Sequence, residues 1–207
     1  MSRIMKEASL VYAVDDDASV RRSLMRALGV ANYRVQAFGT AGELLTALAR
    51  TPPDCLIVDV GLPDLDGLQL QQRLADENHD IPIVFITGHG DIPMSVRAMK
   101  AGAANFLTKP FGVGELINSV REALHVRART DKAAATRAAA RKRLAALSAR
   151  ELQVLRTLAR GRLNKQAATD LGITERTVKF HRAALFRKLG VNGLAEAVTL
   201  LHGARMQ

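Results

Sequence analysis

Acidic, hydroxyl and ammonium side chains follow short apolar runs in the first half of the 207-residue sequence. They are Asp15 and Asp16 after LVYAV, Asp59 in CLIVDV, Thr87 at the end of IPIVFIT, and Lys109 after ANFLT. Crowded carboxylates repel each other, and a hard divalent cation with a preference for oxygen ligands, such as Mg²⁺, is the simplest stabiliser. A metal beside an aspartate also suits phosphoryl transfer, which depends on alignment and charge neutralisation. The pattern therefore favours a Mg²⁺-dependent phosphoryl-transfer site, to which Lys109 adds a cation and Thr87 a hydroxyl donor.

The apolar runs are predicted strands, and amphipathic stretches separate them. The strands are expected at 10–14, 33–38, 55–60, 81–87 and 104–108. Helical spacing of apolar residues between them, as in Val20, Leu24 and Leu28, gives the order βαβαβαβαβα. This alternation predicts an α/β fold, a flavodoxin-like, doubly wound, five-stranded parallel sheet with helices on both faces. Because sites in such sheets lie beyond the carboxyl ends of the strands, the polar residues are expected at one edge.

Three stretches carry a family resemblance: VDDDASVRRSL, LIVDVGLPDLDGLQL and FITGHGDIPMSVRAMKAGAANFLTKPF. Over about residues 8–125 they resemble the receiver domains of NarL/FixJ-type response regulators, and the last stretch is most like the FixJ members. The resemblance implies that Asp59 accepts a phosphoryl group from a partner histidine kinase. It also implies that Asp15, Asp16, Asp59 and the main-chain carbonyl of Gly61 bind Mg²⁺.

The resemblance further implies a switch. The hydroxyl of Thr87 follows the phosphoryl group, Phe106 rotates into the vacated space, and Lys109 pairs with the phosphate. The bond between Lys109 and Pro110 is expected to be cis, an arrangement that costs little only before proline. Asp17 is expected to cap the first helix rather than bind metal.

The fourth helix, about residues 92–101, and the fifth strand are the dimer face that the resemblance implies. Val96, Lys100 and Phe106 are its exposed candidates. For Val96 and Lys100, ordinary helix surface remains an alternative.

The charge distribution divides the chain. Residues 1–125 hold 12 Lys and Arg against 15 Asp and Glu, while residues 126–207 hold 18 against 5, giving formal charges of −3 and +13. A basic half of this size favours a polyanionic partner, nucleic acid first, because neutralised phosphates release counterions.

The sequence gives no sign of export or of a membrane span. Cys55 is the single cysteine and lies in an apolar run, so no intramolecular disulfide can form, which suits a reducing compartment. No run approaches the ~18 apolar residues of a transmembrane helix. A soluble, cytoplasmic protein without a membrane partner is expected.

Residues 126–146 join the two halves. The segment is rich in Ala, Arg and Lys and has neither Gly nor Pro. Helix propensity favours a continuation of the last receiver helix. A charged flexible linker remains the alternative.

Residues 147–207 are expected to form a small all-α domain of four helices. Ser148, Thr174 and Asn192 are expected N-caps, and Gly161, Gly172, Gly190 and Gly203 are expected left-handed residues at helix ends. A helix after the turn at Gly172 would follow another helix, which is helix-turn-helix geometry.

One face of this predicted helix could enter the major groove. It carries a stripe of Arg176, Lys179, Phe180, Ala183 and Arg187. The opposite side carries the core candidates Val178, Leu185 and Leu189. Basic stripes are also common on solvated helix faces, so the stripe alone leaves that alternative open.

The stretch LSARELQVLRTLARGRLNKQAATDLGITERTVKFHRAALFRKLGV is similar to LuxR-type DNA-binding domains, over about residues 145–203. The resemblance implies that Lys179 contacts bases and that Asn164, Lys165 and Thr177 border the phosphate backbone. Glu151 is expected to be structural, as are the core positions of the recognition helix. Ala167, Phe180 and Ala183 depart from the pattern, and Phe180 either contacts thymine methyl groups or packs.

Together these features predict a two-component response regulator and not an enzyme. Phosphorylation of Asp59 is expected to promote a homodimer that binds an inverted-repeat DNA site and regulates transcription, with RNA polymerase as a further partner. One alternative is a DNA-binding regulator whose receiver is inert. The other is an aspartyl-phosphate phosphatase, which is disfavoured because Gly61 stands where such enzymes place a second acid.

Overall fold

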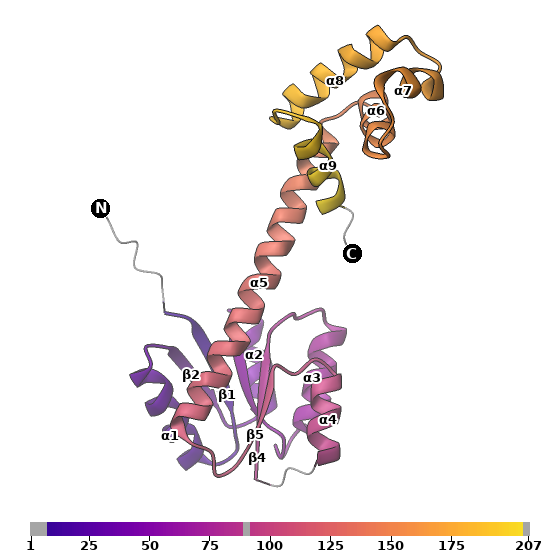
Figure 1. Cartoon of the computed structure of the whole chain (residues 1–207). Coiled ribbons are helices and arrows are strands. Elements are labelled where there is room, and N and C mark those ends of the chain that lie inside the picture. The colour runs from indigo at the N-terminus through magenta and orange to yellow at the C-terminus, as the bar shows by residue number, and fades with distance from the viewer. Residues whose placement is uncertain (1–7, 89–91, 205–207) are drawn as a thin grey trace, which may run out of the picture. The chain divides into compact units, whose positions relative to one another are not determined.

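A parallel five-stranded sheet organises the first part of the computed structural model, which describes residues 8–88 and 92–204 (Figure 1). The strands are β1 (Leu10–Val14), β2 (Arg34–Phe38), β3 (Cys55–Asp59), β4 (Ile83–Thr87) and β5 (Asn105–Thr108). Their order in the sheet is β2-β1-β3-β4-β5, and every hydrogen-bonded neighbour is parallel. The predicted fold class is confirmed, with some strands one or two residues shorter than expected.

Helices cover both faces of the sheet. They are α1 (Ala18–Val30), α2 (Ala41–Leu48), α3 (Gly67–Asp76), α4 (Ile92–Lys100) and α5 (Val113–Ala145). One buried apolar cluster joins the sheet to α2, α3 and α4, and a second joins it to α1 and α5. Alternate residues of β1 enter opposite clusters, so the strand is apolar throughout, as is usual in sheets covered on both sides.

The register of the central strands places two acids side by side. Val14 pairs with Val58 across β1 and β3, so the next residues, Asp15 and Asp59, leave the sheet as neighbours. The strand order also changes direction between β1 and β3, which opens a crevice at their carboxyl ends. The fold thus brings the acids together at the switch point.

Two local features fix the turns around this crevice. Asp17 caps α1, where its side chain accepts a hydrogen bond from the Ser19 amide at 2.6 Å, as expected. Gly67 begins α3 so close to β3 that a Cβ atom would lie 2.7 Å from the main-chain oxygen of Asp59. Only glycine fits there without a backbone shift.

Helix α5 continues through residues 126–145, so this segment is helical in the structure. Its last part packs in the C-terminal unit, where Ala140 is buried and Leu144 contacts the apolar core. Arg143 donates hydrogen bonds to the main-chain oxygens of Leu189 and Gly190. The chain divides by its internal contacts into Met1–Arg129 and Thr130–Gln207, so the end of α5 belongs to the second unit.

The second unit contains four further helices in its described part. They are α6 (Ala149–Ala159), α7 (Asn164–Leu171), α8 (Glu175–Leu189) and α9 (Leu194–Gly203). Their core includes Val154, Leu155, Val178, Leu185, Leu189 and Leu201. The small all-α domain is therefore as predicted, and no helix in the described ranges combines the length and apolar character needed to cross a membrane.

Most of the predicted caps of this unit are confirmed. Ser148 and Thr174 cap α6 and α8. Left-handed glycines end three helices, with φ values of 83° at Gly161, 64° at Gly172 and 59° at Gly190.

Two expected caps are wrong. Gly193, not Asn192, is the N-cap of α9. The main-chain amide of Asn192 donates to the carboxylate of Glu196, which lies in the first turn of the helix. Gly203 is the last residue of α9, and the chain continues with Ala204 in a right-handed conformation.

Candidate functional site

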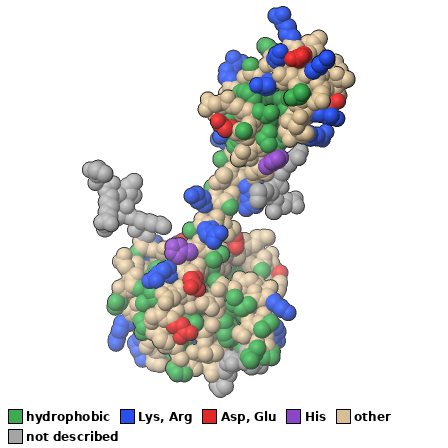
Figure 2. Space-filling view, viewed as in Figure 1, with side chains coloured by type: hydrophobic (Ala, Val, Ile, Leu, Met, Phe, Trp, Pro, Cys, Tyr) green, Lys and Arg blue, Asp and Glu red, His purple; other side chains and the backbone are tan. Residues whose placement is uncertain are grey.

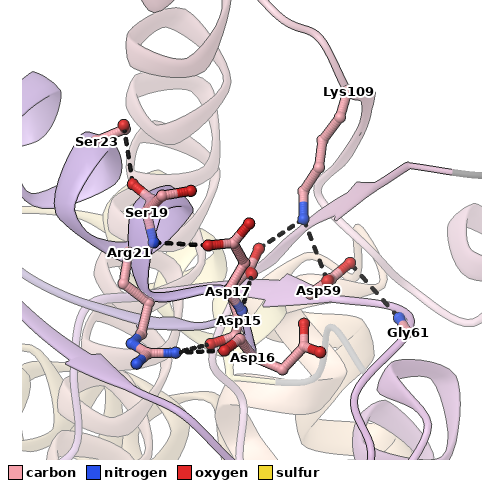
Figure 3. Close-up of polar contacts among 9 residues, drawn as sticks. All are labelled: Asp15, Asp16, Asp17, Ser19, Arg21, Ser23, Asp59, Gly61 and Lys109. Atoms are coloured by element: carbon pink, nitrogen blue, oxygen red, sulfur yellow. Dashed lines mark hydrogen bonds and ion pairs between the residues drawn. The ribbon is translucent and has the colours of Figure 1, made fainter.

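Three carboxylates meet at the carboxyl ends of β1 and β3 (Figure 3). Asp15, Asp16 and Asp59 each offer an oxygen, and these atoms lie within 4.8 Å of one another. Asp15 and Asp59 are buried, whereas Asp16 is exposed. The amide of Gly61, in the loop after β3, points toward Asp59 Oδ1 at 3.5 Å.

Lys109 is the cation of this cluster. Its Nζ lies 2.6 Å from Asp15 Oδ2 and 3.1 Å from Asp59 Oδ2. The peptide bond to Pro110 is cis, and the Lys109 amide donates to the main-chain oxygen of Thr87 at 2.7 Å. The end of β4 therefore helps to fix the main chain of Lys109, from which its side chain extends across the crevice.

The electrostatics of the cluster follow from burial and pairing. Burial raises the pKa of Asp15 above its usual value, although its hydrogen bond with Lys109 opposes that rise. Burial tends to lower the pKa of Lys109, but the hydrogen bonds to Asp15 and Asp59 outweigh it and the pKa is raised. Lys109 thus stays charged as the counterion of both acids.

The donor set fits a hard divalent cation. All three side chains supply carboxylate oxygens, which are the ligands that Mg²⁺ prefers, and the ion commonly keeps several waters. The exposed position of Asp16 leaves one side of the cluster open to solvent. The geometry is therefore suited to Mg²⁺ together with an incoming oxyanion.

Thr87 and Phe106 lie in the neighbouring strands. Thr87 is buried at the end of β4. Phe106 in β5 is half-buried, with its ring centre 6.3 Å from that of Phe85, and it packs on the same apolar cluster as Ala98 of α4. The expectation that Phe106 is exposed is wrong, because this cluster shields its ring.

The outer face of α4 carries apolar and basic side chains. Val96 is 43% exposed and Met99 47% exposed, and Lys100 is also exposed. Ile92, at the start of the helix, is 81% exposed. The face expected to form a dimer is thus open in a single chain.

A groove lies beside the acidic cluster. It has a volume of about 330 Å³ and runs between α1 and the segment that follows β5. Val20, Ala27, Phe111 and Val113 give it apolar walls, and Lys109 also lines it. The same lysine therefore borders both the groove and Asp59.

Helix α8 presents the predicted stripe to solvent. Arg176, Lys179, Phe180, Ala183 and Arg187 are all exposed, while Val178, Leu185 and Leu189 are buried on the other side. Figure 2 shows Lys and Arg side chains spread over the C-terminal unit, with few acidic ones on the face in view.

Two residues of the stripe have informative surroundings. Phe180 is 70% exposed, so of its two expected roles, packing in the domain core is ruled out. Lys179 pairs with Glu175 at 2.9 Å, one turn earlier on α8.

Asn164, Lys165 and Thr177 lie at helix beginnings. Asn164 and Lys165 open α7, and Thr177 is in the first turn of α8, where its amide donates to the Thr174 side chain. The Arg182 guanidinium donates to Asn164 Oδ1 at 3.3 Å and lies 5.5 Å from the ring centre of Phe186. The sequence did not point to Arg182, because this residue lies outside the exposed stripe.

Glu151 has a structural role, as expected. Its carboxylate is buried and accepts hydrogen bonds from the Ser148 amide and from Lys188 Nζ, both at 2.7 Å. The contact with Lys188 is the main reason that the pKa of Glu151 is lowered. It ties the start of α6 to the end of α8.

Arg21 of α1 also reaches the acidic cluster (Figure 3). Its Nη1 donates to the main-chain oxygens of Asp15 at 2.6 Å and Asp16 at 2.9 Å. No residue pattern marks this contact in the sequence, because its acceptors are main-chain oxygens.

Comparisons with known proteins agree with both halves of the structure. A family model described as "Response regulator receiver domain" matches residues 11–121, and one described as "Bacterial regulatory proteins, luxR family" matches residues 145–201. Nodulation protein W of Bradyrhizobium diazoefficiens is 43% identical over 192 residues, which cover 93% of this chain and 85% of that protein.

Solved structures give the same result. A structure of the response regulator StyR matches 94% of this chain and 99% of its own, with 43% identity and a TM-score of 0.80. Full-length FixJ from B. japonicum matches 98% of this chain and 100% of its own, with 37% identity and a TM-score of 0.62. The similarity therefore covers both units and the helix that joins them.

Proposed function

Because the chain belongs to the response regulators that join a receiver domain to a LuxR-type DNA-binding domain, we propose that a phosphoryl group on Asp59 controls DNA binding by α8. The family consists of two-component transcription regulators and not of enzymes. We assign phosphorylation to residues 1–125 and DNA binding to residues 147–207, joined by residues 126–146. The observation that carries the proposal is the contact of Lys109 with both Asp15 and Asp59 beside the carboxylate of Asp16.

In the proposed reaction, a carboxylate oxygen of Asp59 bonds to the phosphorus of a phosphohistidine on a partner kinase. The phosphorus–nitrogen bond breaks, and the imidazole nitrogen leaves with the electron pair. Lys109 turns from Asp59 to the new phosphoryl oxygens and holds their charge. Asp15, Asp16, Asp59 and the main-chain carbonyl of Gly61 would hold Mg²⁺, and the ion would neutralise charge on the oxygens in transfer.

The kinase is expected to approach along the groove between α1 and the segment after β5. Its apolar walls suit a helix of a partner protein, and its border at Lys109 leads to the acidic cluster. A partner seated there could bring its phosphohistidine to Asp59.

The switch then passes through β4 and β5. A phosphoryl group adds charge and acceptor oxygens that the Thr87 hydroxyl can meet by moving toward them. Phe106 is half-buried beside α4, so its rotation would change the surface of that helix. Val96 and Lys100 are exposed there and would contact the second chain of a homodimer.

The dimer would place two copies of α8 on an inverted-repeat operator. Lys179 contacts bases, and Arg176, Ala183 and Arg187 complete the groove-facing stripe. Phe180 is exposed beside them and would contact thymine methyl groups. Asn164, Lys165 and Thr177 would hold the phosphate backbone, and RNA polymerase would be the partner at the promoter.

Treatment of the protein with acetyl phosphate and Mg²⁺ tests the proposal. The wild type should gain the mass of one phosphoryl group, measured by rapid mass spectrometry, and should bind DNA more tightly, whereas Asp59→Asn should do neither. Asp76→Asn, which changes an exposed acid of α3, is the control and should behave as the wild type. A phosphoryl adduct on Asp59→Asn would overturn the proposal, and so would a wild-type DNA affinity that does not change on phosphorylation.

A further inference from the structure

We infer that Arg21 is a positioning residue for the metal site, because it holds the main chain of the loop that carries Asp15 and Asp16. The inference rests on the proposed Mg²⁺ site and adds to it a residue that makes no contact with the metal itself. One guanidinium nitrogen, Nη1, donates to the carbonyl oxygens of both residues, at 2.6 Å and 2.9 Å. Figure 3 shows the guanidinium on the main-chain side of the loop and Lys109 on the carboxylate side.

The carboxylate of Asp15 is already fixed by other groups. Lys109 bonds to its Oδ2, and the Asp17 amide donates to its Oδ1 at 2.9 Å. Asp17 is in turn fixed as the cap of α1. Loss of Arg21 would therefore disturb the carboxylate of Asp15 only slightly.

Asp16 is in a different position. Within residues 8–88 and 92–204, no side chain or amide bonds to its exposed carboxylate. Its orientation depends on its main chain, and the described contact of that carbonyl is with Arg21. Arg21 thus holds the main chain from which the third carboxylate ligand projects.

The surroundings fix Arg21 itself. It is half-buried on α1, and a Cβ atom on Gly39 would lie 3.6 Å from its Nη1, so the guanidinium lies against the segment that follows β2. That segment is held by Glu43, whose carboxylate accepts the Gly39 amide at 2.8 Å. The guanidinium therefore spans from α1 to the ends of two strands.

Charge and positioning predict opposite effects of removing Arg21. A cation near the site repels Mg²⁺, so loss of its charge alone would tighten Mg²⁺ binding. Loss of a residue that orients the ligands weakens metal binding, commonly by 10-fold or more. The direction of the change thus identifies the role.

The test is a Mg²⁺ titration of the unphosphorylated full chain, read from the thermal unfolding midpoint of the receiver transition. Arg21→Met should raise the half-saturating Mg²⁺ concentration roughly 10-fold. Arg21→Lys keeps the charge but reaches fewer acceptors, so its value should lie between those of Arg21→Met and the wild type. Arg22→Met, on the exposed neighbouring residue, is the matched control and should titrate as the wild type.

Each outcome has a distinct meaning. If Arg21→Met titrates as the wild type or binds Mg²⁺ more tightly, the positioning role is overturned while the proposed function stands. If the wild type itself shows no Mg²⁺-dependent midpoint, the metal site fails and the inference fails with it. If Arg21→Met does not fold, Arg21→Lys decides. Half-saturation of Arg21→Lys at the same Mg²⁺ concentration as the wild type would show that the hydrogen bonds from Arg21 to the two carbonyl oxygens do not position the metal ligands.

Discussion

The ammonium group of Lys109 lies 2.6 Å from a carboxylate oxygen of Asp15 and 3.1 Å from one of Asp59, so that one cation serves two buried acids. A phosphoryl group on Asp59 would compete for the same ammonium. The contact that neutralises the resting site is therefore also the one that phosphorylation rearranges.

Lys109→Met should destabilise the receiver when no Mg²⁺ is present. The two buried carboxylates would lose their shared partner, at a cost of about 2 kcal/mol in the free energy of unfolding. Mg²⁺ should restore more stability to this variant than to the wild type, since it would replace the missing charge. Urea unfolding with and without Mg²⁺ measures both effects, with Lys100→Met as an exposed control. Equal stability of Lys109→Met and wild type in both media would contradict the pairing.

Asp15→Asn should stabilise the receiver at neutral pH in the absence of Mg²⁺, raising its thermal midpoint by about 2 to 4 °C. Burial raises the pKa of Asp15 in the folded protein, so the ionised carboxylate costs stability above that pKa. As the pH falls through the raised pKa toward 3.8, the wild type gains a proton and its deficit disappears. Thermal unfolding of both proteins between pH 7 and pH 4 tests this. A stability difference that grows on acidification would have the wrong sign.

Lys179→Ala should weaken binding to an operator selected from a random DNA pool by about 1 to 3 kcal/mol, if the lysine contacts a base. Binding to unrelated DNA should weaken less, because only the phosphate attraction is reduced there. Titrations at several salt concentrations separate the two terms, and Lys142→Ala on α5 serves as the comparison. An equal loss of affinity for the operator and for unrelated DNA would show that Lys179 contacts the phosphate backbone and not a base.

Glu175→Gln should increase DNA affinity roughly twofold at low salt. The Glu175 carboxylate holds Lys179 at 2.9 Å, and an exposed pair at this spacing contributes only a few tenths of a kcal/mol. Removal of the acid frees the lysine and takes one negative charge from the surface that faces DNA. The double variant Glu175→Gln with Lys179→Ala should lose most of the gain; if it keeps all of it, the effect comes from general charge alone.

Glu151→Gln should lower the unfolding midpoint of the C-terminal domain by about 5 °C at neutral pH, because a charged hydrogen bond to Lys188 is lost. Contact with Lys188 lowers the pKa of Glu151, so its contribution is present above pH 4.5 and is lost as the pH falls through the folded value. The variant and the wild type should therefore converge in acid. If the difference between the two unfolding midpoints stays constant down to the lowest pH, the shape of the Glu151 side chain and not its charge stabilises the domain.

The sequence predicted the features that depend on strand ends and helix phase. Asp15, Asp59 and Lys109 follow apolar runs, and parallel strands carry such residues to one edge of a sheet. The buried and exposed sides of α8 likewise follow from a period of 3.6 residues, which separates Val178 from Lys179.

Other contacts could not be predicted, because they join long side chains to main-chain oxygens. Arg21 on the carbonyls of the loop after β1 is one example, and Arg143 on the carbonyls of Leu189 and Gly190 is another. Every residue has a carbonyl group, so the sequence does not mark which of them accepts. The error at Phe106 has a related cause, since its burial depends on how α4 packs against β5.

Helix α5 has one more consequence, for the exchange of modules between related regulators. Ala140, Arg143 and Leu144 complete the C-terminal fold although they precede the domain expected at residues 147–207. A chimera joined at residue 147 would give the recognition helix a foreign cap at Leu189 and Gly190. A junction upstream of Ala140 would keep Arg143 with the helix that it caps. The preferred junction for exchanging receiver domains therefore lies inside α5.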